Sequence, residues 1–583
     1  MATGSAAGAR TAALPGSGRP AGRGLRARSR AGSGRPLLMI LLVLLTTALV
    51  GLPVISVFAS FTDSAASADT LRHLAATIIP GALLETLILC TGVLVGVIVI
   101  GTATGWIAAS CEFPGRRFFE WALLLPLAMP AYITAYAYTD ALQFAGPLQS
   151  ALRAAFGWRY GDYWFPEIRS LAGGIFVFTL VLYPYVYLLA RTAFIARTAA
   201  MIDAARSLGL SSWQTWWQIN VPLARPAIVA GALLALMETL ADYGASVYFG
   251  LQTFTAAIYR AWFSMGDRMA ASQLSALLLV IVLVLLAVER RARGQARFYT
   301  PTASQRPAPR ASLSGGRAIA ASIACALPIL LGFVIPVWLL VRLLIPAWTQ
   351  VDWVRYAQWL MNTVSVGLGG ALVVLLTVLA LAYAARNAAR GMPQAMVRSS
   401  VWLMSLGYAL PGSVIAVGIL VPLARFDNTV DAMMKSAFGI GTGLLLTGTV
   451  FALLYGYLVR YFAVAYQSVE AGLARITPAM DASARSLGAS PLLVFFRVHL
   501  PLLGPSVLAA MLLVFVDVMK ELPATLVLRP FNFDTLAVIA YQLASDERLG
   551  EAALPSLTIV LAGVLPVALL SRAIARAAGP GHA

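Results

Sequence analysis

The sequence predicts an all-α, polytopic membrane protein of about twelve transmembrane helices, arranged in two related six-helix halves. Hydrophobic residues make up 60% of the 583-residue chain and charged residues only 11%. Soluble proteins carry about 25% charged residues, so a soluble enzyme of this size is excluded for lack of a charged surface. Apolar runs of membrane-spanning length recur along the chain, and a block in its middle is repeated near its end.

Residues 1–36 are rich in Gly, Ala, Ser and Arg and contain no acid, which indicates a disordered tail. The first apolar run, 37–58, is longer than the roughly 7–15 residues of a signal-peptide core, so we expect a retained helix. Each further run approaches or exceeds the about 20 residues that cross a bilayer. These runs are 82–108, 119–142, 173–195, 226–250, 272–289, 319–344, 363–385, 398–422, 442–465, 505–528 and 553–572.

Arginine placement predicts the orientation. The chain has 42 Lys and Arg against 24 Asp and Glu, a formal net charge of +18. The segment 290–318, which joins the halves, is rich in arginine and contains no acid. Loops of this kind face the cytoplasm, so we expect both termini there and no binding of nucleic acid. The predicted layout is a tail 1–36, a first module 37–289, a linker 290–318, a second module 319–572 and a tail 573–583.

A duplication relates the two halves. The pentapeptide Ala-Arg-Ser-Leu-Gly occurs at 205–209 and again at 484–488, an offset of 484 − 205 = 279 residues. The same offset pairs Pro222 with Pro501, Pro226 with Pro505, Glu238 with Asp517 and Asp242 with Glu521. Repeated matches at one fixed offset indicate two copies of one module.

Each copy of the repeat falls in a cytoplasmic loop between the fourth and fifth helices of its half. A short Ala-rich helix ends at Gly209 or Gly488, a residue type common at helix C-termini, and Pro222 or Pro501 precedes the next membrane helix. We expect two short helices on the cytoplasmic face that form a docking surface for a symmetric pair of soluble subunits. An ordinary amphipathic loop would explain one copy but not two.

These loops resemble the EAA motif of ABC importer permeases. The matching residues are Asp203, Ala204, Ala205, Gly209 and Pro222 in the first copy and Asp481, Ala484, Gly488 and Pro501 in the second. The second copy departs from the pattern, because Asp481 is one residue further from its glycine and Ala482 takes the acidic place. The stretches 237–250, 258–268 and 520–537 are similar in particular to the fused iron(III) permeases of bacterial inner membranes.

The resemblance implies the fold of a type I ABC importer permease in the inner membrane, surrounded by lipid. It implies a transport subunit rather than an enzyme, with an ABC ATPase homodimer on the paired loops and a periplasmic solute-binding protein that delivers ferric iron. ATP and Mg²⁺ would be bound by the ATPase, because neither Lys435 nor Lys520 belongs to a phosphate-binding loop, and this chain would hold no cofactor. Thiamine or phosphonate permeases share this layout, and an ATP-independent transporter or channel is the more distant alternative.

Four acids are expected inside the membrane, where charge is costly and needs a reason. Glu238 and Asp242 lie in 226–250, and their repeat mates Asp517 and Glu521 lie in 505–528. Each pair is spaced i, i+4 and would share one face of a helix, so we expect the four acids to line the translocation pathway. Carboxylate oxygens suit hard cations such as Fe³⁺. Structural pairing, for example with Lys520, is the alternative.

Tyr132 and Tyr136 are further pathway candidates. They share a helix face with Asp140 near the outer end of 119–142. Phenol and carboxylate oxygens are possible ferric ligands, but a belt of aromatic residues at the membrane interface is the interpretation we favour. No resident metal site is predicted, because the three cysteines and three histidines are scattered.

Overall fold

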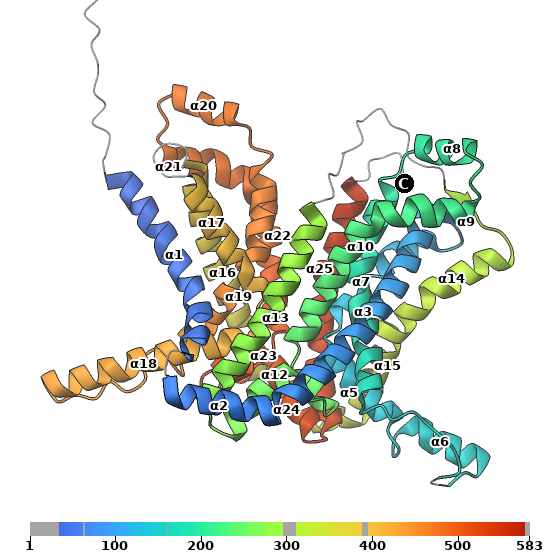
Figure 1. Cartoon of the computed structure of the whole chain (residues 1–583), viewed down its shortest axis with the longest axis horizontal. Helices are drawn as coiled ribbons and strands as arrows, with labels where there is room; N and C mark the ends of the chain where they lie inside the picture. The colour runs from blue at the N-terminus through green and yellow to red at the C-terminus, as the bar shows by residue number, and fades with distance from the viewer. Residues whose placement is uncertain (1–33, 62–63, 160, 295–309, 388–393, 578–583) are drawn as a thin grey trace, which may run out of the picture.

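The computed structural model describes residues 34–61, 64–159, 161–294, 310–387 and 394–577, and these form a bundle of long helices (Figure 1). Most of the expected N-terminal tail, the middle of the linker and the end of the C-terminal tail lie outside the described residues. The described strands are β1 (Cys111–Glu112) and β2 (Ala311–Ser312), which pair in parallel. This pairing fixes the end of the linker to the first half.

The helices of the first half follow one another in chain order. They are α1 (Gly34–Ala59), α2 (Ser64–Thr77), α3 (Ile79–Ser110), α4 (Arg116–Ala122), η1 (Leu125–Ala128), α5 (Ala131–Leu142), α6 (Pro147–Phe156), α7 (Leu171–Ile195), α8 (Ala199–Ser207), α9 (Ser212–Thr215), η2 (Trp216–Asn220), α10 (Val221–Ala241), α11 (Gly244–Tyr248), α12 (Phe254–Tyr259), η3 (Arg260–Ser264) and α13 (Arg268–Gly294).

The second half has a similar order. Its helices are α14 (Gly316–Ile329), η4 (Leu330–Val334), α15 (Ile335–Ala347), η5 (Trp348–Gln350), α16 (Trp353–Asn387), α17 (Gln394–Ser405), η7 (Leu406–Ala409), α18 (Gly412–Phe438), α19 (Val450–Leu473), α20 (Pro478–Ser486), α21 (Pro491–Val494), η8 (Phe495–His499), α22 (Leu500–Met519), α23 (Pro523–Leu528), α24 (Leu536–Ser545) and α25 (Leu549–Ala577).

Helix boundaries repeat at the offset seen in the sequence. The first residues of α7 and α19 are 450 − 171 = 279 residues apart, as are those of α8 and α20 (478 − 199) and those of α10 and α22 (500 − 221). The duplication is therefore visible in the helices as well as in the residues.

Nine helices of the described residues are long and apolar enough to cross a membrane, or ten if one bent pair counts as a span, rather than the expected twelve. The bent pair replaces the expected span 119–142, where α4 and η1 meet α5 at 90°. Met129 and Pro130 are extended there, because proline cannot donate the helical hydrogen bond and disfavours helix at the residue before it. The expected span 398–422 is interrupted in the same way at Leu410 and Pro411.

Three other expected spans have different limits. Two helices end earlier than expected: α10 stops at Ala241 within the expected span 226–250, and α22 stops at Met519 within the expected span 505–528. The expected 442–465 begins late, since α18 continues to Phe438 and α19 starts only at Val450. In the span count α1 contributes only a shorter apolar helix, Val43–Ala59.

The first helix of each half crosses to the other half. Pro53 of α1 lies against Gly418 of α18, and the Ser56 hydroxyl donates a hydrogen bond of 2.5 Å to the Gly418 carbonyl. In the reciprocal contact, the Tyr138 hydroxyl of α5 donates to the Leu331 carbonyl of η4 at 2.5 Å. Both hydrophobic cores therefore combine residues from the two halves.

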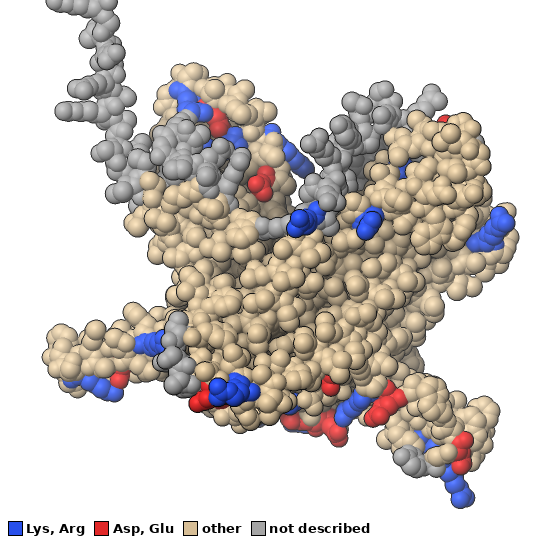
Figure 2. Space-filling model, viewed as in Figure 1, with Lys and Arg blue, Asp and Glu red and all other residues tan. Residues whose placement is uncertain are grey.

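The two ends of the bundle differ. Helices α8 and α20 stand at one end, while α6 and the second half of α18 project sideways from the other (Figure 1). A band across the middle of the visible face shows almost no Lys, Arg, Asp or Glu, whereas acids gather at the end opposite α8 and α20 (Figure 2). An uncharged band of this kind is the surface expected to face lipid.

Candidate functional site

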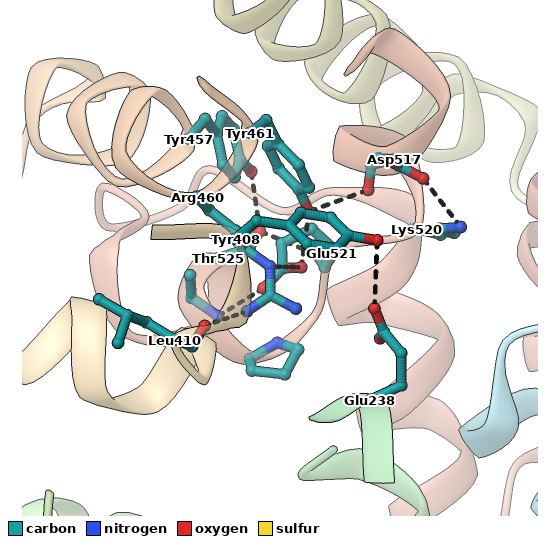
Figure 3. Close-up of polar contacts among 12 residues, drawn as sticks. Glu238, Tyr408, Leu410, Tyr457, Arg460, Tyr461, Asp517, Lys520, Glu521 and Thr525 are labelled. Atoms are coloured by element: carbon teal, nitrogen blue, oxygen red, sulfur yellow. Dashed lines mark hydrogen bonds and ion pairs between the residues drawn. The ribbon is translucent and has the colours of Figure 1, made fainter. Parts of the chain in front are cut away.

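A cavity of about 130 Å³ lies where the two halves meet. The ends of α10 and α22, the middle of α7 and α19, the break at Pro130, and Tyr408 of η7 surround it. Helix ends leave room that continuous helices would fill. Its ionisable lining residues are Glu238, Asp242, Arg460, Asp517, Lys520 and Glu521, together with several tyrosines. All four acids expected in the pathway therefore lie at one cavity, and Figure 3 shows three of them.

Two of these acids cap short helices. The Asp242 carboxylate accepts hydrogen bonds from the Ala245 and Ser246 amides, at 2.9 and 3.1 Å, at the start of α11. Its repeat mate Glu521 accepts one from the Ala524 amide at 3.0 Å at the start of α23. Both acids follow the end of the preceding helix, so the prediction that each pair shares one helical face is wrong. Side-chain capping of free amides explains why the chain breaks at these points.

Glu521 also forms an ion pair with Arg460 (Figure 3). Its Oε2 lies 3.1 Å from Nε of Arg460 and accepts a hydrogen bond of 2.7 Å from the Tyr461 hydroxyl. Arg460 also donates to the Leu410 carbonyl at 3.2 Å, at the break before α18. Arg460 was not among the residues predicted from the sequence. An arginine inside the apolar run 442–465 is nevertheless the same kind of signal, a charge within a membrane span, that singled out the acids.

Glu238 and Asp517 form the other pair of repeat mates. The Lys520 ammonium lies 2.9 Å from Asp517 Oδ1, which is one of the pairings that the sequence left open. Glu238 accepts a long hydrogen bond of 3.4 Å from the Tyr408 hydroxyl (Figure 3). Four carboxylates thus face two cations, Arg460 and Lys520, and the lining carries a formal surplus of two negative charges. Within the described residues, no three His, Cys, Asp or Glu side chains converge closely enough to hold a metal ion.

The two candidate tyrosines lie inside the bundle. Tyr132 is 4% exposed and lines the cavity, and Tyr136 is 1% exposed behind it, with ring centres 5.7 Å apart. Neither hydroxyl has a hydrogen-bond partner among the described residues. A lipid-facing aromatic belt does not describe these positions, because both side chains are enclosed by protein.

The two EAA-like loops form matching helical pairs, α8 with α9 and α20 with α21, at the same end of the bundle (Figure 1). Gly209 and Gly488 follow the first helix of each pair with φ of 76° and 83°, a conformation that favours glycine. The next amides donate back to Ala205 and Ala484, each at 3.1 Å. Pro222 and Pro501 stand in the first turn of α10 and α22.

The loops are attached to the bundle by different side chains. In the second half, Asp481 accepts hydrogen bonds from Arg386 at 2.9 Å and from His499 at 2.7 Å. Burial raises the pKa of Asp481, but the hydrogen bonds from Arg386 and His499 outweigh it and hold that pKa below its ordinary value. In the first half, Arg197 binds Asn220 at 3.2 Å, and its guanidinium lies 4.4 Å from the Trp106 ring centre. Among the described residues, Asp203 has no such ion pair.

The chain is similar in sequence to membrane components of known transport systems. Residues 101–290 match the family described as binding-protein-dependent transport system inner membrane component. The chain is 27% identical over 497 residues to the Fe(3+)-transport system permease protein FbpB 2 of Haemophilus influenzae, covering 84% of this chain and 89% of that protein.

Two shorter relatives match part of the chain. The molybdenum transport system permease protein ModB of Escherichia coli K12 is 24% identical over 194 residues, covering 32% of this chain and 82% of that protein. The putative 2-aminoethylphosphonate transport system permease protein PhnV of Salmonella typhimurium is 33% identical over 180 residues, covering 30% of this chain and 61% of that protein.

The polytopic helical fold and these similarities define the chain as a permease subunit of an ABC importer, a transport protein rather than an enzyme. Of the three relatives described, the Fe(3+) permease is similar over the largest share of the chain.

Proposed function

We propose that this chain forms the membrane passage of an importer for ferric iron. Its modules are residues 37–289 and 319–572, joined by the linker 290–318. The central cavity lies between them, and rocking of the two halves exposes it alternately to either side of the membrane.

The surplus of acid in the cavity supports a cationic passenger. The four carboxylates supply the oxygen ligands that hard cations prefer. Arg460 and Lys520 are already bonded to Glu521 and Asp517. An anion such as a phosphonate would therefore meet uncompensated negative charge, which disfavours that alternative. Thiamine, an organic cation, is the alternative that charge alone does not disfavour. Because the acids do not form a metal site, iron passes through this cavity and is held tightly elsewhere, by a periplasmic binding protein.

The paired helices α8 and α20 are the proposed docking sites for an ATPase homodimer, which binds ATP and Mg²⁺. Their repeat symmetry fits two identical subunits. Each helix is followed directly by an exposed apolar side chain, Leu208 (78% exposed) after α8 and Leu487 (87% exposed) after α20. This end of the bundle and both termini would then be cytoplasmic, and the binding protein would dock at the opposite, acid-rich end.

Transport by the reconstituted complex tests the passenger. The permease, its ATPase and its binding protein are placed in proteoliposomes, and uptake of radioactive iron is followed with and without ATP. We expect ATP-dependent uptake of iron that excess thiamine or phosphonate does not reduce. Uptake of thiamine without uptake of iron would contradict the iron assignment and leave the permease class unchanged.

Substitution of the loop glycines tests the docking sites. Gly209→Asp with Gly488→Asp places a side chain at positive φ, which costs about 1–2 kcal/mol at each loop. We expect ATPase association to weaken by about tenfold or more. Gly157→Asp is the matched control, because Gly157 also has positive φ (67°) with open space around it but follows α6 at the other end. Undiminished co-purification of the ATPase with the double variant would contradict the assignment.

A further inference from the structure

A second pocket, of about 760 Å³, lies on the side of the bundle between α1, α13 and α18. It lies at the end opposite α8 and α20, where α1 finishes and α13 begins (Figure 1). It shares no lining residue with the central cavity, so transport as described above does not use it.

The charged residues that line this pocket are basic. Arg268 and Arg425 line it, and no acid does so among the described residues. Both arginines are exposed, and neither guanidinium has an ion pair or hydrogen bond within the described structure. By contrast Arg72 and Arg548, at the same end, lie 2.8 and 2.6 Å from a carboxylate oxygen. The pocket is therefore lined by two cations that no carboxylate of the described residues neutralises.

Acids close in sequence do not neutralise these arginines. Asp267 accepts a hydrogen bond of 2.9 Å from the Ala270 amide in the first turn of α13. Asp427 is completely buried, and Thr447 donates to it from both its amide (2.8 Å) and its hydroxyl (2.6 Å). Asp267 thus bonds within its own turn, and Asp427 bonds to a residue 20 positions further along the chain. Among the described residues, neither carboxylate forms an ion pair with Arg268 or Arg425.

The pocket lies at the level where the apolar core of a membrane meets the headgroups. Arg268 is the first residue of an apolar span, and Ser56 and Ser60, near the end of α1, also line the pocket. Trp262 also lines the pocket, a residue type enriched at this level. From here α18 projects sideways (Figure 1), with Phe426 and Met433 exposed as in a helix that lies in the membrane interface.

We propose that this pocket binds an anionic phospholipid. Arg268 and Arg425 hold the phosphate, because guanidinium groups match phosphate in charge and in hydrogen-bonding geometry. Leu420 and Val421 form an apolar wall beside them, along which an acyl chain lies. The lipid would bridge α1 of the first half and α18 of the second, at the contact between Pro53 and Gly418. Its role would be to hold the crossed first helix in place.

Native mass spectrometry of the purified full-length permease tests this site. The protein is titrated with phosphatidylglycerol, and the bound lipid is counted for the wild type and for Arg268→Gln with Arg425→Gln. An arginine near an anionic membrane surface contributes about fivefold to the affinity, so we expect the double variant to bind the tightest lipid more than tenfold more weakly. Arg268→Lys with Arg425→Lys should keep most of the binding, and Arg72→Gln, which removes a paired arginine, should keep all of it.

The competing outcomes overturn the proposal. Equal retention of phosphatidylglycerol by the wild type and the Gln variant would show that the pocket is not the site. Equal binding of phosphatidylcholine would show that charge does not select the lipid. If inorganic phosphate raised the unfolding temperature as much as phosphatidylglycerol does, the pocket would be a site for free anions. Loss of affinity for the binding protein with unchanged lipid retention would make this surface a protein-docking site.

Discussion

Glu238 and Asp242 are four residues apart and have different roles in the cavity. Asp242 caps α11 through two backbone amides, whereas Glu238 receives only a long hydrogen bond from Tyr408. Their repeat mates differ in the same way, since Glu521 caps α23 and Asp517 does not. Charge and architecture can therefore be separated by substitution.

Removing charge at Glu238 should impair transport without harming the fold. Glu238→Gln keeps the shape and removes one negative charge from a site with low solvent access, and we expect iron uptake to fall by about tenfold or more at a normal membrane level. Asp242→Ala should instead lower stability by about 1 kcal/mol through loss of the cap, while Asp242→Asn, which can still cap, should not. Uptake rates and protein levels are measured together. Normal uptake by Glu238→Gln would mean that this acid does not face the passenger.

Arg460 should be the most sensitive residue of the cluster to single substitution. Arg460→Met leaves the buried Glu521 without its partner, and breaking a buried pair costs about 3–5 kcal/mol. Arg460→Met combined with Glu521→Gln removes both charges and should recover most of that loss. Thermal unfolding of the purified variants measures the difference. A double variant no more stable than Arg460→Met would show that the arginine stabilises chiefly through the Leu410 carbonyl.

At the scale of the element, α20 depends on one polar attachment. No residue of α20 is buried, so apolar packing does not hold it. In α8, by contrast, Ala205 is only 1% exposed. The bonds from Arg386 and His499 to Asp481 therefore tie the second docking helix to the bundle.

This attachment should be lost in acid. The pKa of Asp481 is lower in the folded protein than in an unfolded chain, so its contribution is complete above about pH 4, the ordinary Asp value, and disappears as the pH falls through the lowered pKa. We expect α20 to remain attached between about pH 5 and 7. Asp481→Ala should release it at every pH and speed hydrogen exchange of the 478–486 amides about tenfold, with 199–207 as the internal control. Equal exchange in the variant and the wild type would contradict this role.

The elements show which features the sequence could predict. Long helices were recognisable from apolar runs, because spanning a bilayer requires length and hydrophobicity together. The breaks at Pro130 and Pro411 were missed, because the apolar residues continue without interruption on both sides of each bend. Each proline was nevertheless a local signal of a break. The early end of α10 was also missed, because the i, i+4 spacing of the two acids is compatible with a continuous helix. Only the structure shows that Asp242 caps the following helix, α11.

At the scale of the molecule, the sequence repeat predicted which acids are equivalent but not what surrounds them. Arg460, Tyr408 and Tyr461 have no counterpart of the same type 279 residues earlier, where the sequence has Val181, Met129 and Leu182. The pairing of Glu521 therefore depended on contacts between segments far apart in the chain. The packing of the first helix of each half against the other half could not be predicted either, because an apolar run does not indicate which helix it packs against.

The contact between α1 and α18 should tolerate no side chain at Gly418. A Cβ atom there would lie 2.4 Å from the Pro53 carbonyl oxygen, so either helix must move. We expect Gly418→Val to destabilise the protein by about 1–3 kcal/mol, as overpacking does. Gly504→Val is the control, because Gly504 lies in α22 with open space around it. Membrane accumulation and unfolding temperature are compared, and equal values for the two variants would contradict the crossed packing.

The crossed first helix also has a consequence for synthesis. Pro53 leaves the ribosome 418 − 53 = 365 residues before its partner Gly418. At roughly 5–20 residues per second, this delay is about 20–70 s. During that time α1 lies in the lipid without its partner α18, and the two helices pack together only after α18 has been inserted. Fusion of the two modules keeps the waiting helix tethered to the half that it will join, where separate polypeptides would have to find each other in the membrane.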